Sequence, residues 1–169
     1  MTKRQQGAVG SPENQPATPL SVLQRFRVLI RSSQRHSHWI EKHSGVTGAQ
    51  LWAMQELSES PGLRVGELAK RMALHQSTAS NLIDKLESGG HLYKERQAAD
   101  HRVVRLHLTE GGAALLAAAP SPARGALPEA LRLMDEASLA RLQGDLDTLL
   151  AHIHQVDEGF GMQPLPFSE

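Results

Sequence analysis

The chain has 169 residues, a length that suits one domain, or one domain with an added dimerisation element. Hydrophobic residues make up 40% of it but aromatic residues only 4%, so its core must be mainly aliphatic. It has no cysteine, which excludes disulfides, thiolate metal ligands and cysteine nucleophiles. The sequence also lacks the ~18-residue apolar run of a bilayer-spanning helix and, at its start, the apolar block of a secretory signal. We therefore expect a soluble, cytoplasmic protein with no membrane partner.

The formal net charge is zero, but the charges are unevenly distributed along the chain. Residues 1–61 hold seven basic and four acidic residues, and residues 62–109 hold eight and five. Residues 110–169 hold three basic and nine acidic residues. A chain that is neutral in sum can therefore still present a basic face to an acidic partner such as nucleic acid.

Hydrophobic periodicity divides the chain into helices and one hairpin. Residues 1–18 are rich in Gln, Pro, Ser and Gly, which predicts a disordered tail. Apolar residues at helical spacing, with Thr47 as a cap, predict helices over about 20–43, from 48 to Pro61, 65–72 and 76–87. The period then changes to two, which predicts antiparallel strands over about 92–96 and 101–109. A further helix is predicted over 109–119, before three prolines.

The last predicted helix, about residues 136–157, carries a long and narrow apolar stripe. Its members are Leu139, Leu142, Leu146, Leu149, Ile153 and Val156. Such a stripe is typical of a helix that pairs with helices of a partner. We expect residues 19–61 and 110–158 to form a helical dimerisation region, and residues 159–169 to form a loose tail.

Residues 62–109 are the candidate DNA-binding domain. Two short helices joined at about residues 73–75 have the spacing of a helix-turn-helix. Short polar side chains at the start of the second helix can approach base edges, and basic side chains there and in the hairpin can reach phosphates or a minor groove. The predicted DNA-binding residues are Gln76, Ser77, Thr78, Ser80, Asn81, Lys85, Arg96, His101 and Arg102.

The segments GELA, STASNLIDKLESGG and DHRVVRLHLT resemble the winged helix-turn-helix of the multiple antibiotic resistance regulator (MarR) family, and VTGAQLWAMQEL is similar to that family's second helix. The helix order fits over about residues 20–158. The resemblance implies a mainly α fold with a small β-hairpin wing, flanked by N- and C-terminal dimerisation helices. It further implies a homodimer that binds a pseudo-palindromic operator with one recognition helix per half-site, and that Asp100 helps to hold Arg102 for the minor groove.

Two positions depart from the family pattern. Arg64 stands where a Thr or Ser cap is common, and it would add a phosphate contact to the DNA-binding set. Asn81 stands where the family often has Arg, so an operator sequence cannot be carried over from relatives.

The first helix bears a basic face whose plain interpretation is a solvated surface. Arg27, Arg31, Arg35, His38 and Lys42 fall within roughly an 80° sector of that helix. Many MarR-family proteins bind small aromatic carboxylates or phenols between the dimer helices and the DNA-binding lobe. We therefore predict a repressor, without a cofactor, that is released by an aromatic acid such as a hydroxybenzoate or hydroxynicotinate. The predicted effector residues are Arg31, Arg35, His36, His38, Trp39 and Trp52.

Two other functions stay open as alternatives, and a third is not expected. A zinc-responsive regulator would need His36 with His43 and a remote carboxylate, because the chain has no cysteine. A protein-interaction module could use the last helix. An enzyme is not expected, because the sequence has no Gly-rich phosphate loop, nucleophile elbow or embedded carboxylate pair.

Overall fold

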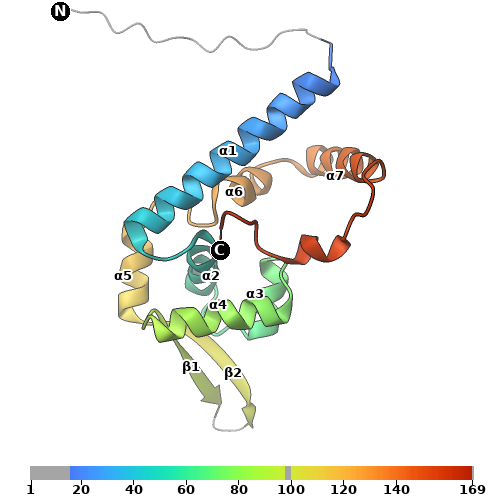
Figure 1. Cartoon of the computed structure of the whole chain (residues 1–169). Helices are drawn as coiled ribbons and strands as arrows, with labels where there is room; N and C mark the ends of the chain where they lie inside the picture. The colour runs from blue at the N-terminus through green and yellow to red at the C-terminus, as the bar shows by residue number, and fades with distance from the viewer. Residues whose placement is uncertain (1–15, 98–99, 169) are drawn as a thin grey trace, which may run out of the picture.

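The computed structural model describes residues 16–97 and 100–168, with only the backbone described for residues 97 and 100–102. The described part is mainly helical, with one antiparallel hairpin (Figure 1). Its elements are α1 (Pro19–Ser44), α2 (Gly48–Glu59), α3 (Val65–Arg71), α4 (Gln76–Ser88), β1 (Leu92–Gln97), β2 (Asp100–Leu108), α5 (Glu110–Ala118), α6 (Ala126–Arg132), α7 (Glu136–Leu150) and the 3-10 helix η1 (Glu158–Met162). This architecture confirms the predicted fold class.

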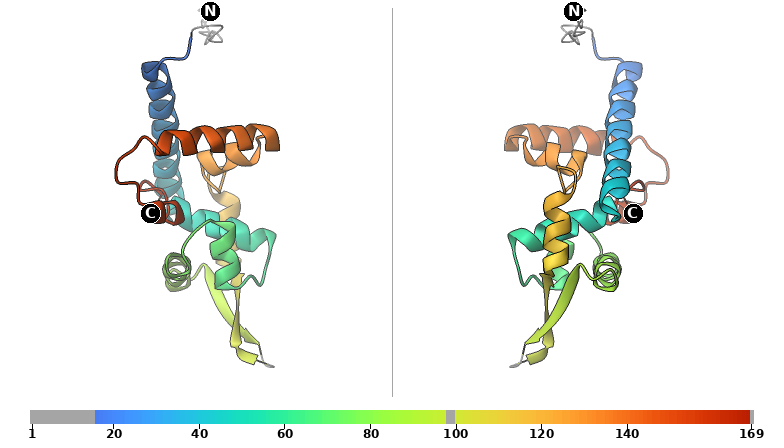
Figure 2. Two further views of the ribbon diagram at one scale, coloured as in Figure 1. Left: turned by 90° about the vertical axis from the view of Figure 1, so that its right-hand side faces the viewer. Right: turned by 90° about the vertical axis from the view of Figure 1, so that its left-hand side faces the viewer.

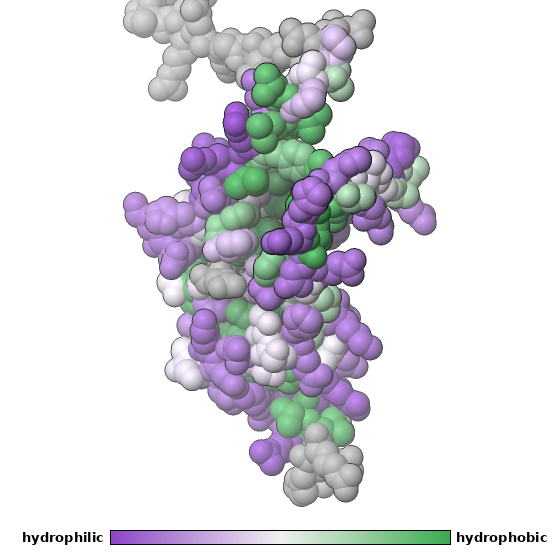
Figure 3. Space-filling view, turned by 45° about the vertical axis from the view of Figure 1, so that its right-hand side comes forward, coloured by the Kyte–Doolittle hydropathy of each residue, from purple (hydrophilic) through white to green (hydrophobic). Residues whose placement is uncertain are grey.

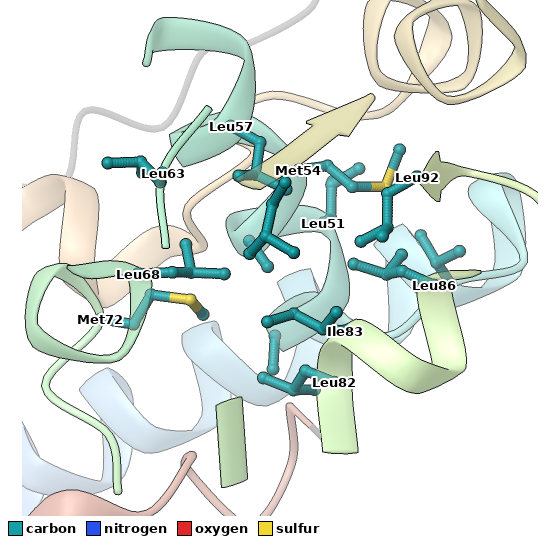
Figure 4. Packing of buried hydrophobic residues seen from close by; sticks show 14 of the residues in the cluster. Leu51, Met54, Leu57, Leu63, Leu68, Met72, Leu82, Ile83, Leu86 and Leu92 are labelled. Carbon is teal, nitrogen blue, oxygen red and sulfur yellow. The ribbon is translucent and has the colours of Figure 1, made fainter. Parts of the chain in front are cut away.

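The buried core lies around α2, in the half of the molecule that carries α3, α4 and the hairpin (Figure 4). The side chains of Leu51 and Met54 on α2 are fully buried, as are Ile83 on α4 and Leu106 on β2. Burying one such side chain contributes about 1.5–3 kcal/mol to folding. The core is aliphatic, as the composition predicts.

Helix α1 is anchored at one end only. Thr18 begins it with a capping box, accepting a hydrogen bond from the Ser21 amide at 3.1 Å. Its buried residues, Ser33, Ser37 and Ile40, all lie in its second half. The first turns extend away from the body, at the end opposite the hairpin (Figure 2). These turns have no burial to hold them within one chain.

The hairpin is tied to the core at its base. Strands β1 and β2 pair in antiparallel register, with Leu92 opposite Leu108. Leu63 forms an isolated bridge to Leu106, whose amide donates to the Leu63 carbonyl at 3.0 Å. An isolated β-bridge therefore ties the segment before α3 to the base of the wing. Among the described residues, no helix is long and apolar enough to cross a bilayer.

The structure differs from the sequence predictions near the end of the chain. Helix α7 ends at Leu150 rather than near residue 157, and Ile153 and Val156 beyond it are exposed. No burial within the chain stabilises further helical turns there. Residues 161–168 are not the expected loose tail, because the Ser168 carbonyl accepts a hydrogen bond from the Ala49 amide at 2.8 Å. Their apolar side chains instead help to line a cavity.

Candidate nucleic-acid interface

The two helices of the helix-turn-helix are held by a tight turn over residues 72–75. Ala73 adopts a left-handed conformation with φ of 51°, and the Leu74 amide donates to the Ala69 carbonyl at 2.9 Å. On α4, Leu82 and Ile83 are buried against the core. Packing of this apolar face leaves the polar face of α4 directed outward.

The outward face of α4 carries the residues predicted to contact DNA. Gln76, Ser77, Asn81 and Lys85 are exposed, and Thr78 and Ser80 are half-buried. The Ser80 hydroxyl donates to the Gln76 carbonyl at 3.0 Å, so its donor hydrogen is already used within the helix. The exposed members are therefore the stronger candidates for base contacts. Figure 1 shows α4 and the hairpin at the same end of the molecule.

Two predicted basic contacts flank this helix. Arg64 is exposed at the start of α3, where its amide donates to the Glu67 carboxylate at 2.7 Å. Arg96 is exposed on β1 near the hairpin tip. The side chains of Asp100, His101 and Arg102 lie outside the described residues, so the expected contact between Asp100 and Arg102 stays a prediction.

Lys94 is a positioning residue that sequence analysis missed. Its ammonium group lies 2.7 Å from carboxylate oxygens of both Asp84 and Glu87, on α4. Hydrogen bonds to Asp84 and then Glu87 raise the pKa of Lys94 above its usual range. The double ion pair joins β1 to the recognition helix, so the wing and α4 present their outer faces together. The i,i+3 spacing of Asp84 and Glu87 is a signal for such a pair, but the sequence does not reveal the partner.

The residues predicted to hold an effector do not converge on one site within the chain. Arg31 and Arg35 border one shallow depression on α1, and Arg35, His36, His38 and Trp39 border another. Trp52 lies elsewhere, in the wall of a separate cavity.

That separate cavity has a volume of 530 Å³ and an ion-pair network at its edge. The Trp52 indole donates to the Glu56 carboxylate at 3.0 Å, and the Arg124 guanidinium donates to the same oxygen at 2.9 Å. Arg124 also binds Glu59, and this hydrogen bond lowers the pKa of Glu59 below its usual range. Arg124 lies in the loop before α6, so the network ties that loop to α2.

The zinc alternative finds no site within the described part of the chain. There, no three or more His, Asp or Glu side chains gather closely enough to hold a metal. The His36 ring bonds the Pro122 carbonyl at 2.9 Å, and the His43 ring bonds the Trp39 carbonyl at 2.8 Å. Both histidines proposed as ligands therefore already have backbone partners.

Comparison with known proteins identifies the central segment. Residues 44–103 match the model of the MarR family. The HTH-type transcriptional regulator YsmB of Bacillus subtilis is 34% identical over 91 residues, which cover 49% of this chain and 62% of that protein. The HTH-type transcriptional repressor MdtR of B. subtilis is 35% identical over 68 residues, covering 40% of this chain and 44% of that protein. The chain thus spans less than two thirds of the length of these relatives.

Solved structures extend the likeness to the whole fold. A MepR-like protein crystallised with pseudoligands superposes with a TM-score of 0.56 at 24% identity, covering 79% of this chain and 97% of that chain. MarR of E. coli in its apo form superposes with a TM-score of 0.52 at 19% identity, covering 80% of this chain and 99% of that chain. Residues 44–103 are thus similar to the MarR family, and the superpositions show that the chain shares the winged-helix fold of these solved structures.

Proposed function

We propose that this protein is a homodimeric regulator of transcription that binds duplex DNA with α4 in a major groove and the wing beside it. The observation that carries this proposal is the polar outer face of α4, fixed next to the wing by Lys94 and directed away from the core. Two relatives support it: MdtR is named as a repressor, and a MarR mutant from E. coli has been crystallised with operator DNA. Repression is the mode we propose here.

A fluorescence-anisotropy titration with the duplex upstream of the protein's own gene tests DNA binding. We expect affinity to fall steeply with salt, because phosphate contacts release counterions. Asn81→Ala should reduce discrimination against unrelated DNA by ~1–3 kcal/mol, the value of a base contact. Ser88→Ala is the matched control, because Ser88 is exposed at the far end of the same helix and bonds the Asp84 carbonyl. Equal affinity for all duplexes, or none in dilute buffer, would overturn the proposal.

Unpartnered apolar faces support the homodimer. Leu20 on α1 is 72% exposed and Ile153 beyond α7 is 52% exposed, with further exposed leucines on both helices. Figure 3 shows apolar surface along the first turns of α1 and in the angle between α1 and α7. Exposed apolar surface on this scale is typical of an interaction face, and MarR-like helices at both ends of the chain make a second copy the natural partner.

Leu149→Lys tests the dimer by placing a charge on the apolar stripe of α7. We expect this variant to sediment as a monomer and to bind the operator duplex at least tenfold more weakly. Thr148→Lys introduces the same charge one residue away, at a position that is also exposed, and should remain dimeric. A monomeric wild-type protein, or a Leu149→Lys variant that still dimerises, would refute the proposed interface.

We further propose that an anionic aromatic acid binds the basic face of α1 and releases the DNA. This proposal is supported by the exposed guanidinium groups of Arg31 and Arg35 beside a depression in the surface. Isothermal titration with 2-hydroxybenzoate and 6-hydroxynicotinate tests it. Arg35→Met should abolish binding, whereas Arg27→Met, at another exposed position of the helix, should retain it. No heat from either acid at millimolar concentration would exclude this effector class.

A further inference from the structure

Helix α2 carries a buried carboxylate whose charge is not explained by stability alone. Glu56, near the end of that helix, is only 6% exposed. Taking an ionised carboxylate out of water is costly, and replacing a buried ion pair by well-packed apolar residues is often neutral or stabilising. A buried charge at this position therefore points to a role in fixing the direction of the elements around it.

The two oxygens of Glu56 face different parts of the chain. Its Oε1 accepts a hydrogen bond from the Arg124 guanidinium at 2.9 Å and another from the Trp52 indole at 3.0 Å. Its Oε2 lies 3.6 Å from Nη1 of Arg71, the last residue of α3. Arg124 belongs to the loop between α5 and α6. One rigid, planar carboxylate thus joins this loop to the helix-turn-helix.

The loop between α5 and α6 is fixed to helices outside the DNA-binding half. The His36 ring, on α1, bonds the Pro122 carbonyl of the loop at 2.9 Å. Figure 1 shows α6, which follows the loop, beside α1. The exposed apolar turns of α1 form one face of the proposed dimer. The loop therefore fixes Glu56 relative to the helix that carries this face.

On the other side of Glu56, Arg71 acts on two helices that move together. Leu68 of α3 is fully buried, and the Leu74 amide donates to the Ala69 carbonyl at 2.9 Å, so the turn holds α3 and α4 closely. Apolar packing is non-directional, so it keeps α2 and α3 in contact without selecting one angle. The Arg71 guanidinium also donates to the Ser60 hydroxyl at 2.8 Å, and its charged contacts are directional. A rotation of α3 on α2 has to break these contacts, and α4 turns with α3.

We infer that Glu56 is a positioning residue that sets the angle of α3 and α4 relative to the dimer-forming helices, through Arg71 on one side and Arg124 on the other. In a dimer, this angle determines the distance between the two recognition helices, and so the half-site spacing that the protein accepts. The angle is a property of one chain, whereas its effect on half-site spacing rests on the proposed function.

Double electron–electron resonance between two spin labels measures the spread of this angle within one chain. Because the natural chain has no cysteine, Ser88→Cys on α4 and Ala130→Cys on α6 introduce two exposed labelling sites. Dilution with excess unlabelled protein restricts the signal to distances within one chain. We expect one narrow distance distribution in this background, and a distribution at least twice as wide after addition of Arg71→Met. Arg71 is 43% exposed, so its loss should leave the core folded.

Two further variants separate positioning from a general loss of charge. Glu56→Gln should widen the distribution as Arg71→Met does, because its amide keeps one acceptor oxygen and turns an NH2 group towards Arg71. Lys70→Met is the matched control, since it removes a charge from an exposed position one residue earlier on α3, and it should leave the width unchanged. An equal width with and without Arg71→Met, or a wide distribution before any of these changes, would overturn the inference.

A second measurement examines half-site spacing. The DNA is the duplex upstream of the protein's own gene, alone or with one base pair inserted at its centre, which separates the half-sites by ~3.4 Å and rotates them by about 35°. We expect the wild-type protein to bind the longer duplex at least tenfold more weakly, and the Arg71→Met variant less than threefold more weakly.

The ratio of the two affinities distinguishes positioning from stability. A substitution that only destabilised the protein would lower both affinities equally and leave their ratio unchanged. An unchanged ratio in the Arg71→Met variant would therefore overturn the effect on spacing. Absence of any DNA binding by the wild-type protein would instead refute the proposed function, and the distances between the labels would still decide the role of Glu56.

Discussion

The start of α5 packs so closely on the turn before β1 that only glycine fits at position 112. A Cβ added to Gly112 would lie 2.0 Å from the His91 carbonyl oxygen, whereas real Cβ contacts essentially never fall below 3.0 Å. In the same place, the Thr109 amide donates to the His91 carbonyl at 3.1 Å and the Thr109 hydroxyl donates to the Gly90 carbonyl at 2.7 Å. We therefore predict that Gly112→Ala forces α5 away from the base of the wing.

The cost of this displacement follows from the contacts that it disturbs. The added Cβ overpacks the contact and forces the backbones of residues 91 and 112 apart by about 1 Å, which lowers the free energy of unfolding by about 1–3 kcal/mol. The same movement weakens the two hydrogen bonds of Thr109, each of which contributes about 1 kcal/mol. We expect Gly112→Ala to lower the free energy of unfolding by about 2–4 kcal/mol in urea denaturation at fixed protein concentration. Gly111→Ala is the control, because its nearest neighbour is the Thr109 hydroxyl at 3.7 Å, and helix propensity should make it up to about 1 kcal/mol more stable. A Gly112→Ala variant as stable as the Gly111→Ala variant would refute the packing argument.

Three further predictions concern the turn, the ion-pair network and the wing. Ala73→Gly should raise the free energy of unfolding by up to about 1 kcal/mol, because it relieves the left-handed φ; a loss of stability on thermal melting would contradict this. Arg124→Met should destabilise the protein by about 3 kcal/mol at pH 7, because Glu56 is buried and loses its closest ion partner. Because Arg124 lowers the folded-state pKa of Glu59, its stabilisation is present above the usual carboxyl pKa and is lost as the pH falls through the folded value. In urea titrations, the difference in the free energy of unfolding between wild type and the Arg124→Met variant should therefore become smaller below about pH 4.5. A difference that does not change with pH would exclude this contribution of Glu59. Arg102→Ala should weaken DNA binding in anisotropy titrations, and the slope of log affinity against log salt concentration should become about 1 less steep. Unchanged affinity would show that Arg102 does not contact phosphate.

The elements that sequence analysis located are those whose signals are local. Thr47, which was predicted as a cap, accepts a hydrogen bond from the amide three residues later, so the start of α2 could be predicted directly from the sequence. The alternation around Leu106 predicted β2, and Leu106 is fully buried in the structure. In each case the deciding interactions lie within one turn or one strand.

Features that depend on distant residues could not be predicted. The Arg124–Glu56 pair joins residues 68 positions apart, and no periodicity signals it. A helical wheel correctly placed Arg35 on an outer face of α1, but it could not show that Trp52 faces a different cavity. A helical wheel shows on which face of its own helix a side chain lies. A binding site also depends on which other element packs beside that face, and the wheel does not show this.

The distribution of burial indicates how DNA affinity should depend on protein concentration. Around α2 the chain has its own core, so each protomer can hold its α4 and wing in place without a partner. Helix α7 contains no buried residue, and the first turns of α1 contain none, so the second copy in the proposed homodimer would supply their packing. A monomer would then retain a folded recognition helix but read only one half-site. In the proposed dimer, the second half-site binds at high effective concentration, which raises affinity without any new contact within a protomer. Operator binding should therefore fall abruptly once the protein concentration is below the dissociation constant of the dimer. The near-ultraviolet circular dichroism signal of the folded core should remain at these concentrations.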